Sequence, residues 1–365
     1  MILTIIFLNF AVYMDNRLFF EDAIGLLARL IATPSVSRDE TAAADIIESY
    51  MRDCRLSPKR EKNNVWAVCD NFRDDRPTLL LNAHIDTVKP VASWTKDPFH
   101  PEIIDGKLYG LGSNDCGGGL VTLLQVYRML KDHDDLSYNL IYLASAEEEV
   151  SGKDGISRVL PLLPKIDVAI VGEPTGMQPA VAEKGLMVLD VVSHGKSGHA
   201  ARNEGVNALY GMIDDLCWIR DYRFPKVSDL LGPVKMTATV IHAGTQHNVI
   251  PDRCEVTVDV RVNELYTNEE VFEIVKSHLN SDVHAHSFRL NSSHIDMDHP
   301  IVKKCVSMGM TPFGSPTLSD QALMSFQSLK LGPGQSARSH SADEYIELVE
   351  MQQALEQYLE IISDM

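Results

Sequence analysis

The chain has 365 residues, of which 33 are basic and 51 acidic, and its formal net charge is −18. Hydrophobic residues make up 45% of it, so a sizeable core can form, and the length suggests two domains. The acidic balance argues against a nucleic-acid-binding protein and against attraction to an anionic membrane, because both need basic surface.

The first segment, "MILTIIFLNFAVYM", is apolar, but it has no basic residue ahead of it and no small-residue cleavage site. It is also too short to span a bilayer. A helical pattern starts naturally at Met14, so we interpret residues 1–13 as an extraneous N-terminus from a mis-assigned start codon rather than as a targeting segment. The six cysteines are scattered without C-x-x-C spacing, which is typical of a reduced, cytoplasmic protein.

Helical and strand patterns alternate from about residue 18 to residue 180. Apolar residues have helical spacing in "FFEDAIGLLARLIA", "ETAAADIIESYMRD" and "GGLVTLLQVYRMLKD". Short unbroken apolar runs occur between them, in "NNVWAVC", "TLLLNAH", "NLIYLASA" and "DVAIVGEP". Short apolar runs between helices favour parallel strands that are buried on both faces, and therefore an α/β fold.

The pattern changes near Gly185, where half-polar strands and amphipathic helices follow in the order β-α-β-β-α-β. In "CEVTVDVRV" the valines alternate strictly with polar residues, which predicts a strand with one open face. Helical patterns return near residue 299. We therefore predict a larger α/β domain with a mixed, mostly parallel sheet flanked by helices (residues 1–180 and 294–365), interrupted by an inserted two-layer α+β module (residues 181–293).

Three of the predicted parallel strands end in potential metal ligands. His84 and Asp86 end one strand, Glu147–Glu149 end another, and Glu173 ends a third. Ligand sites in open α/β sheets lie outside the carboxyl ends of the strands, and Asp115 lies at the start of a predicted helix, where an acidic group is favoured. One imidazole and several carboxylates that converge at a single sheet edge would be electrostatically unfavourable without bound cations. Nitrogen and oxygen donors without thiolates suit zinc, with cobalt or manganese as substitutes.

The glycine-rich segment "YGLGSNDCGGG" first suggests a nucleotide-binding loop. Asp115 occupies the place of the third glycine in G-x-G-x-x-G, and no Gly-Lys-Ser/Thr follows. The nucleotide interpretation therefore fails, and we expect the glycines to allow close backbone approach beside Asp115.

Seven segments, in order and spacing, resemble the dizinc amidohydrolase family that includes acetylornithine deacetylase, succinyl-diaminopimelate desuccinylase and glutamate carboxypeptidase. The resemblance runs from about residue 18 onward, and the short length and the "GPGQSARSHSADEYI" ending are most similar to the acetylornithine deacetylase branch. The segments are "AHIDTVKP", "YGLGSNDCGGG", "ASAEEEVSGKDG", "VGEPT", "SGHAA", "GTQHNVIPDRCEVTVDVR" and "SARSHSADE".

The resemblance implies a fold with a zinc-peptidase-like catalytic domain and an inserted lid or dimerisation domain. It also implies five ligands for two zinc ions: His84 and Glu173 on one, His340 and Glu149 on the other, and Asp115 bridging both.

The resemblance further assigns Glu148 as the general base and Asp86 as the support of the His84 imidazole, whereas Glu147 receives no definite role. Relatives usually have Met-Lys-Gly-Gly after the bridging aspartate, with a cis peptide at that point, but here Cys116 and glycines follow. Cys116 is open to interpretation as a chance small residue, an adventitious ligand or an oxidation-sensitive position, and we favour the first.

In the inserted domain, the resemblance implies that His199 reaches the active site of a neighbouring subunit and polarises the scissile carbonyl. Asn248 and Arg261 match substrate-binding positions, with Arg261 pairing with the substrate's α-carboxylate. A homodimer through the inserted domain follows from the role of His199.

The implied activity is zinc-dependent hydrolysis of a small N-acyl amino acid, with N-acetylornithine or N-succinylornithine in arginine biosynthesis as the first expectation. A desuccinylase of succinyl-diaminopimelate, or a dipeptidase or carboxypeptidase on the same centre, is the alternative. A catalytically silent metal-binding homologue is the non-enzyme alternative, and the loss of a ligand or of the base would favour it. None of these residues is missing.

Overall fold

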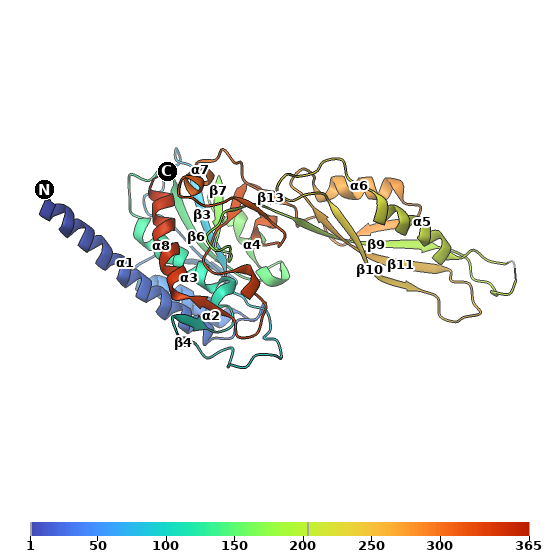
Figure 1. The fold of residues 1–365 in the computed structure, drawn as a ribbon, viewed down its shortest axis with the longest axis horizontal. Helices are drawn as coiled ribbons and strands as arrows, with labels where there is room; N and C mark the ends of the chain where they lie inside the picture. Colours follow the sequence, from blue (N-terminus) through green and yellow to red (C-terminus); the bar gives the residue numbers. More distant parts are fainter. Residues whose placement is uncertain (1, 203, 365) are drawn as a thin grey trace. The chain divides into compact units, whose positions relative to one another are not determined.

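The computed structural model (Figure 1) describes residues 2–202 and 204–364, without the side chains of residues 2–15. The chain divides into two compact units. The first contains the described residues up to Val181, Ile295–Phe313 and those from Met324 onward; the second contains Ala182–His294 and Gly314–Leu323. The prediction that residues 1–13 are an extraneous N-terminus stays a prediction, because the side chains of these residues are not among those described.

The main sheet is mixed and has nine strands. Its order is β1-β2-β6-β3-β7-β15-β8-β13, and β14 pairs with β8. The pairs β6–β3, β3–β7 and β7–β15 are parallel, whereas the described pairs on either side of them are antiparallel. The strands are β1 (Lys59–Glu61), β2 (Asn64–Val68), β3 (Thr78–His84), β6 (Asn139–Ser145), β7 (Val168–Val171), β8 (Ala180–Glu183), β13 (Ser293–His294), β14 (Phe313–Ser315) and β15 (Gln327–Lys330).

The parallel centre of this sheet confirms the α/β prediction and its physical basis. Every residue of β3, β6 and β7 is buried. These strands are the unbroken apolar runs of the sequence, which can be accommodated only where both faces of the sheet are covered.

Helices cover the sheet, and α3 packs against β3 and β6 while contacting α1 and α8 (Figure 1). In α2, the buried residues Ala43, Ala44, Ile47 and Met51 recur at helical spacing and form the face turned to the core. A small antiparallel sheet has the order β16-β5-β4. These elements are α1 (Ile2–Ile31), α2 (Thr41–Asp53), β4 (Glu102–Ile104), β5 (Lys107–Tyr109), α3 (Gly118–Leu130), α4 (Ile156–Val159), α7 (Pro300–Ser307), β16 (Tyr345–Glu347) and α8 (Leu348–Ser363).

The second unit contains a four-stranded antiparallel sheet of order β10-β11-β9-β12 with two helices. Along β11 the valines are buried while the residues between them are partly exposed, as the alternation predicts. The chain order agrees with the predicted β-α-β-β-α-β pattern: β9 (Gly185–His194), α5 (Ala208–Asp221), β10 (Lys235–Ala243), β11 (Arg253–Val262), α6 (Asn268–His278) and β12 (Asp282–Ala285).

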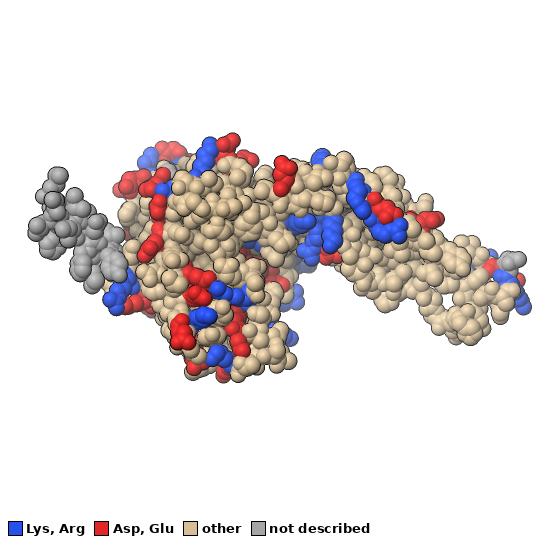
Figure 2. All heavy atoms as spheres, in the orientation of Figure 1, with Lys and Arg blue, Asp and Glu red and all other residues tan. Residues whose placement is uncertain are grey.

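Among the described residues, no helix combines the length and the apolar character that a membrane span requires. On the face shown in Figure 2, acidic and basic side chains are interspersed over the first unit.

The glycines at the start of α3 permit close packing, as the sequence analysis expected. A Cβ atom on Gly119 would lie 1.8 Å from the carbonyl oxygen of Gly172, directly after β7. Cβ atoms on Gly117 and Gly118 would lie 2.4 Å from the oxygen of Gly112 and 2.1 Å from Cδ1 of Ile346. Larger residues would therefore push α3 away from the sheet edge.

We predict that Gly119→Ala lowers the free energy of unfolding by at least about 2 kcal/mol, because the new methyl group meets backbone rather than a mobile side chain. Gly25→Ala is the matched control, since a Cβ there meets nothing within 4 Å, and it should stabilise α1 by about 0.5–1 kcal/mol. Denaturant titration of both variants measures the difference. Equal stabilities would contradict this account of the packing.

Candidate metal centre

Three neighbouring strands bring their carboxyl ends together at the candidate site. In the sheet order β6-β3-β7, His84 is the last residue of β3, a short turn with Glu148 and Glu149 follows β6, and Glu173 follows β7. Asp115 comes from the segment ahead of α3. The structure thus gathers these predicted residues at one sheet edge.

Asp115 lies between the two histidines. Its Oδ1 is 3.3 Å from Nε2 of His84, and its Oδ2 is 3.6 Å from Nε2 of His340. Each oxygen of one carboxylate therefore faces a different imidazole, which is the arrangement that a bridging ligand between two cations needs.

Each histidine also has a carboxylate of its own. The two Glu149 oxygens lie 3.2 and 3.0 Å from Nε2 of His340, and Oε1 of Glu173 lies 3.7 Å from Nε2 of His84. Glu148 is 4.0 Å from the same His84 atom. Two groups of three residues each bring potential ligand atoms within 4.8 Å of one another. One group is His84, Cys116 and Glu173, and the other is His84, Asp115 and Glu149.

The electrostatics of the centre favour a cation. Burial, together with the negative charge of Asp115, raises the pKa of Glu173 to about 8, and burial raises the pKa of Glu149. Oε1 of Glu173 is buried and has no hydrogen-bond partner in the described part of the chain. Buried carboxylate oxygens without hydrogen-bond partners, next to histidine nitrogens, form a set of donors that suits a divalent metal ion.

The Asp86 side chain mainly holds the turn that carries the two glutamates. Its Oδ1 accepts from the backbone N–H of Glu148 at 3.0 Å, and its Oδ2 accepts from the N–H of Glu149 at 3.2 Å and from the Ser37 hydroxyl at 2.7 Å. His84 Nδ1 lies 2.8 Å from the backbone carbonyl oxygen of Asp86 and 3.6 Å from its carboxylate. The carbonyl oxygen is thus the nearer partner of the imidazole.

Glu344 is a supporting residue that the sequence analysis missed. Its carboxylate is buried and accepts from the backbone N–H groups of Gly112 (3.1 Å), Asn114 (2.8 Å) and Asp115 (2.9 Å). It therefore fixes the backbone that presents Asp115. Its only signal in the sequence was its place four residues after His340, at the end of a segment quoted for the resemblance.

Glu147, which the sequence left without a role, shapes the loop after β6. Its backbone lies in the left-handed region (φ 54°), and its N–H donates to the buried carboxylate of Glu40 at 3.2 Å. Its own carboxylate accepts from the N–H of Asp154 at 3.3 Å. Asn64 holds the same loop, accepting from the N–H of Ala146 and donating to the carbonyl of Asp154. These contacts give Glu147 a structural part in the loop that follows β6.

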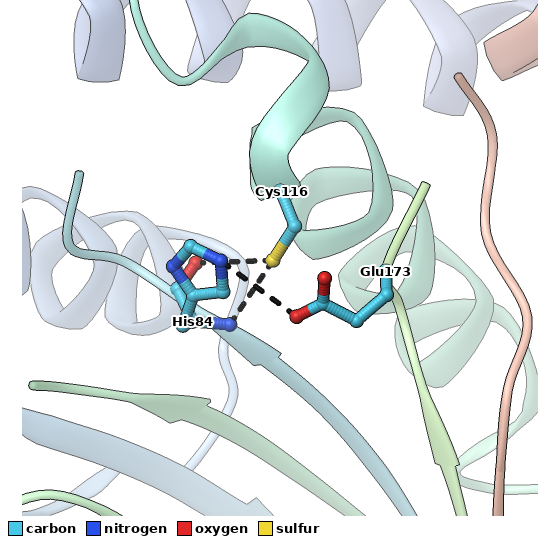
Figure 3. A group of neighbouring side chains, drawn as sticks. All are labelled: His84, Cys116 and Glu173. Atoms are coloured by element: carbon cyan, nitrogen blue, oxygen red, sulfur yellow. Dashed lines mark hydrogen bonds and ion pairs between the residues drawn. The ribbon is translucent and has the colours of Figure 1, made fainter. Parts of the chain in front are cut away.

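Cys116 faces His84, as Figure 3 shows. Its Sγ accepts from the backbone N–H of His84 at 3.2 Å and lies 3.6 Å from the carbonyl oxygen of the same residue. The peptide bond from Asp115 to Cys116 is cis, as in the family that the sequence resembles. Burial raises the pKa of the Cys116 thiol well above its usual value.

The three remaining predicted residues, His199, Asn248 and Arg261, all lie in the second unit. The Ala200 N–H donates to the carbonyl oxygen of Asn248 at 3.0 Å, so the loops that carry His199 and Asn248 are neighbours. Arg261 pairs with Asp259 at 2.9 Å.

Comparison with known proteins gives a consistent set of relatives. Residues 80–364 match the family described as peptidase family M20/M25/M40. The chain is 30% identical to an acetylornithine deacetylase of Shigella sonnei over 92% of this chain and 94% of the relative. It is 26% identical to a succinyl-diaminopimelate desuccinylase of Wolbachia pipientis over 74% and 72% of the two chains.

The fold also has a close counterpart among solved structures. A dinuclear metal-binding peptidase of the M20 family from Bacillus subtilis superimposes with a TM-score of 0.71 at 16% identity, over 94% of this chain and 98% of the other. At this identity the similarity supports the fold.

The buried Glu40 generates a prediction on pH. Burial, followed by the neighbouring charges of Asp86 and Glu147, raises the pKa of Glu40 from 4.5 to about 7. The folded state therefore binds a proton that the unfolded state has lost, and this contribution to stability disappears as the pH rises from about 4.5 through about 7.

Glu40→Gln cannot titrate at this position. Between pH 5 and 8, the metal-free wild-type protein should lose more unfolding free energy than this variant, by on the order of 1 kcal/mol. Urea denaturation across this range measures both curves, and parallel curves would contradict the assignment.

Proposed function

The chain belongs to peptidase family M20/M25/M40, and from this premise we propose that it hydrolyses the amide bond of a small N-acyl amino acid at a two-metal centre. The observation that carries the proposal is that one oxygen of the Asp115 carboxylate faces His84 and the other faces His340, while Glu148 lies 4.0 Å from Nε2 of His84. The chain contains every ligand and the base that the family resemblance assigns. This argues against a catalytically silent homologue.

We propose His84 and Glu173 as ligands of one cation, His340 and Glu149 as ligands of the other, and Asp115 as the ligand of both. Zinc suits the nitrogen and oxygen donors, with cobalt or manganese as substitutes. Two bound cations would supply Lewis acidity that lowers the pKa of water and polarises the amide carbonyl.

Glu148 is the proposed general base. It lies beside the centre, although neither of the two ligand-type groups contains it. In this role its carboxylate takes a proton from the attacking water and returns the proton to the leaving amine. The hydrogen bonds from the Glu148 and Glu149 N–H groups to Asp86 keep the base and the neighbouring ligand in a fixed relation, so Asp86 is a positioning residue.

We propose N-acetylornithine as the substrate, with N-succinylornithine as the related choice, in the cytoplasmic synthesis of arginine. Similarity to an acetylornithine deacetylase along nearly the whole of both chains supports this. The similarity to a desuccinylase leaves succinyl-diaminopimelate as the competing substrate, and a dipeptide as a further one.

Arg261 and Asn248 are the proposed substrate-binding residues of the second unit. Lys235 on β10 is paired in register with Arg261 on β11. Burial is the main cause that lowers the pKa of Lys184, and the positive charges of Lys235 and Arg261 lower it further. Three neighbouring cations suit the α-carboxylate of an amino acid.

His199 is proposed to polarise the scissile carbonyl in the site of a partner subunit, which requires a homodimer. Strand β10 lies at one edge of the four-stranded sheet, and its Val240 and Ile241 are 45% and 50% exposed. An exposed edge strand with apolar side chains is a natural surface for strand pairing between two copies of the chain.

The protein loaded with zinc should release acetate from N-acetylornithine faster than it cleaves succinyl-diaminopimelate or a dipeptide, when the substrates are assayed side by side. Glu148→Gln keeps the shape of the side chain but cannot accept a proton, so turnover should fall by about 10²–10⁴-fold with two metal ions still bound. Metal analysis of the same samples provides the control. Near-normal turnover of the variant, or the absence of amide hydrolysis by the wild type, would overturn the proposal.

Sedimentation velocity should show a dimer, and Ile241→Lys should shift it towards monomer because a charge would be buried in the β10 pairing. Activity should fall with the dimer fraction if His199 acts across subunits. A fully active monomer would contradict both the interface and the role of His199.

A further inference from the structure

Asn114 is fully buried, and neither the metal assignment nor the proposed reaction uses its side chain. Its Oδ1 accepts a hydrogen bond from the backbone N–H of Gln335 at 2.9 Å, and its Nδ2 donates to the carbonyl oxygen of the same residue at 3.1 Å. Nδ2 also donates to the Ser339 hydroxyl at 3.4 Å. One amide side chain thus forms the pair of hydrogen bonds that a neighbouring strand would form. It links the residue before Asp115 to the segment that carries His340.

The segment that carries His340 is held at both of its ends by the backbone or side chain of Asn114. Its first residue is Gln335, which bonds the Asn114 amide. At its other end, the Glu344 carboxylate accepts from the backbone N–H groups of Asn114 and Asp115. Between these points, His340 has a left-handed backbone conformation (φ 56°), and its side chain is 56% exposed. Burial does not fix an exposed imidazole, so its position depends on how the segment is held.

Gly334 leaves room for the Asn114 side chain. Its backbone lies in the left-handed region (φ 87°), and a Cβ atom there would lie 2.3 Å from Oδ1 of Asn114. A different contact links the same segment to α8, since the Arg338 guanidinium donates to both carboxylate oxygens of Glu350 at 2.6 and 3.1 Å. The Arg338 contact therefore joins the segment to a helix, whereas Asn114 joins it to the residues that present the bridging carboxylate.

We propose that Asn114 is a positioning residue that holds His340 in register with the His84 half of the centre. The inference rests on the two-metal centre of the proposed function. The side chain of His84 is 1% exposed and is fixed by its surroundings, whereas that of His340 is not. In a variant without the Asn114 amide, Glu344 still holds the backbone around Asp115. The start of the His340 segment, in contrast, loses two hydrogen bonds, so the loss falls on the cation of the His340 half.

Stepwise metal binding tests this role. Titration of the metal-free, full-length protein with Zn²⁺ against a competing chelator should resolve two steps, of which the weaker belongs to the His340 half. In Asn114→Ala the weaker step should lose about 10–100-fold in affinity, as expected when the support of a metal ligand is removed, while the tighter step should change less than about threefold. Equal losses in both steps, or an unchanged weaker step, would overturn the proposal.

Asn139→Ala is the matched control, because Asn139 is also fully buried and makes the same kind of contacts. Its Oδ1 accepts from the Arg73 N–H at 2.9 Å, and its Nδ2 donates to the carbonyl oxygens of Arg73 and Arg76 at 2.8 and 2.9 Å. It is the first residue of β6, whereas the turn with Glu148 follows the last. Thermal unfolding should show both variants folded but destabilised. The control should keep both metal-binding steps, and a weaker step lost equally in both variants would contradict a specific role of Asn114.

Electron paramagnetic resonance with two equivalents of Mn²⁺ provides a readout independent of affinity and of activity. Two ions that share one carboxylate are spin-coupled, so the wild type should give a coupled spectrum and Asn114→Ala mainly the spectrum of isolated ions. Equal coupled spectra would contradict the proposal. A wild type that binds one ion would overturn the two-metal centre and this inference together. A wild type that binds two ions and cleaves amides, beside an Asn114→Ala variant with unchanged metal binding, would overturn this inference alone.

Discussion

The concentration of negative charge around Asp115 is the constraint on which the rest of the site depends. This carboxylate lies between two imidazoles, and Glu149 and Glu173 flank it from separate strand ends. Carboxylates that are buried together raise one another's pKa unless a cation offsets their charge. A pair of divalent ions shared by Asp115, as we propose, would account for this arrangement with the residues present.

The surrounding contacts serve the same constraint by fixing backbone rather than by adding ligands. Glu344 binds three N–H groups around Asp115, and Asp86 binds the N–H groups of Glu148 and Glu149. Asn64 holds the loop that follows β6. Such anchoring keeps the groups of a metal centre in place before a substrate arrives, which is the condition for efficient catalysis. The glycines at the start of α3 let this helix pack closely against the sheet edge, next to Asp115.

Much of the fold and of the candidate site could be predicted, because short sequence patterns indicate the strands that form them. Unbroken apolar runs indicated β3, β6 and β7, and the residues at or just after their ends indicated His84, Glu149 and Glu173 as candidate ligands. His340 was indicated only by the family resemblance. The alternation of β11 indicated the antiparallel sheet. The supports could not be predicted in this way, because Glu40 and Asn64 act on a loop far away in the chain and no local pattern marks them. Cys116 was interpreted as a chance residue, since only the fold shows its sulfur beside His84 and Glu173.

The central claim is that Asp115 bridges two cations. Anomalous scattering from crystals grown with zinc tests it most directly, because peaks at the zinc edge locate the ions without reference to activity. The account predicts two peaks, one between Asp115 and His84 and the other between Asp115 and His340. A single peak, or peaks away from Asp115, would contradict it.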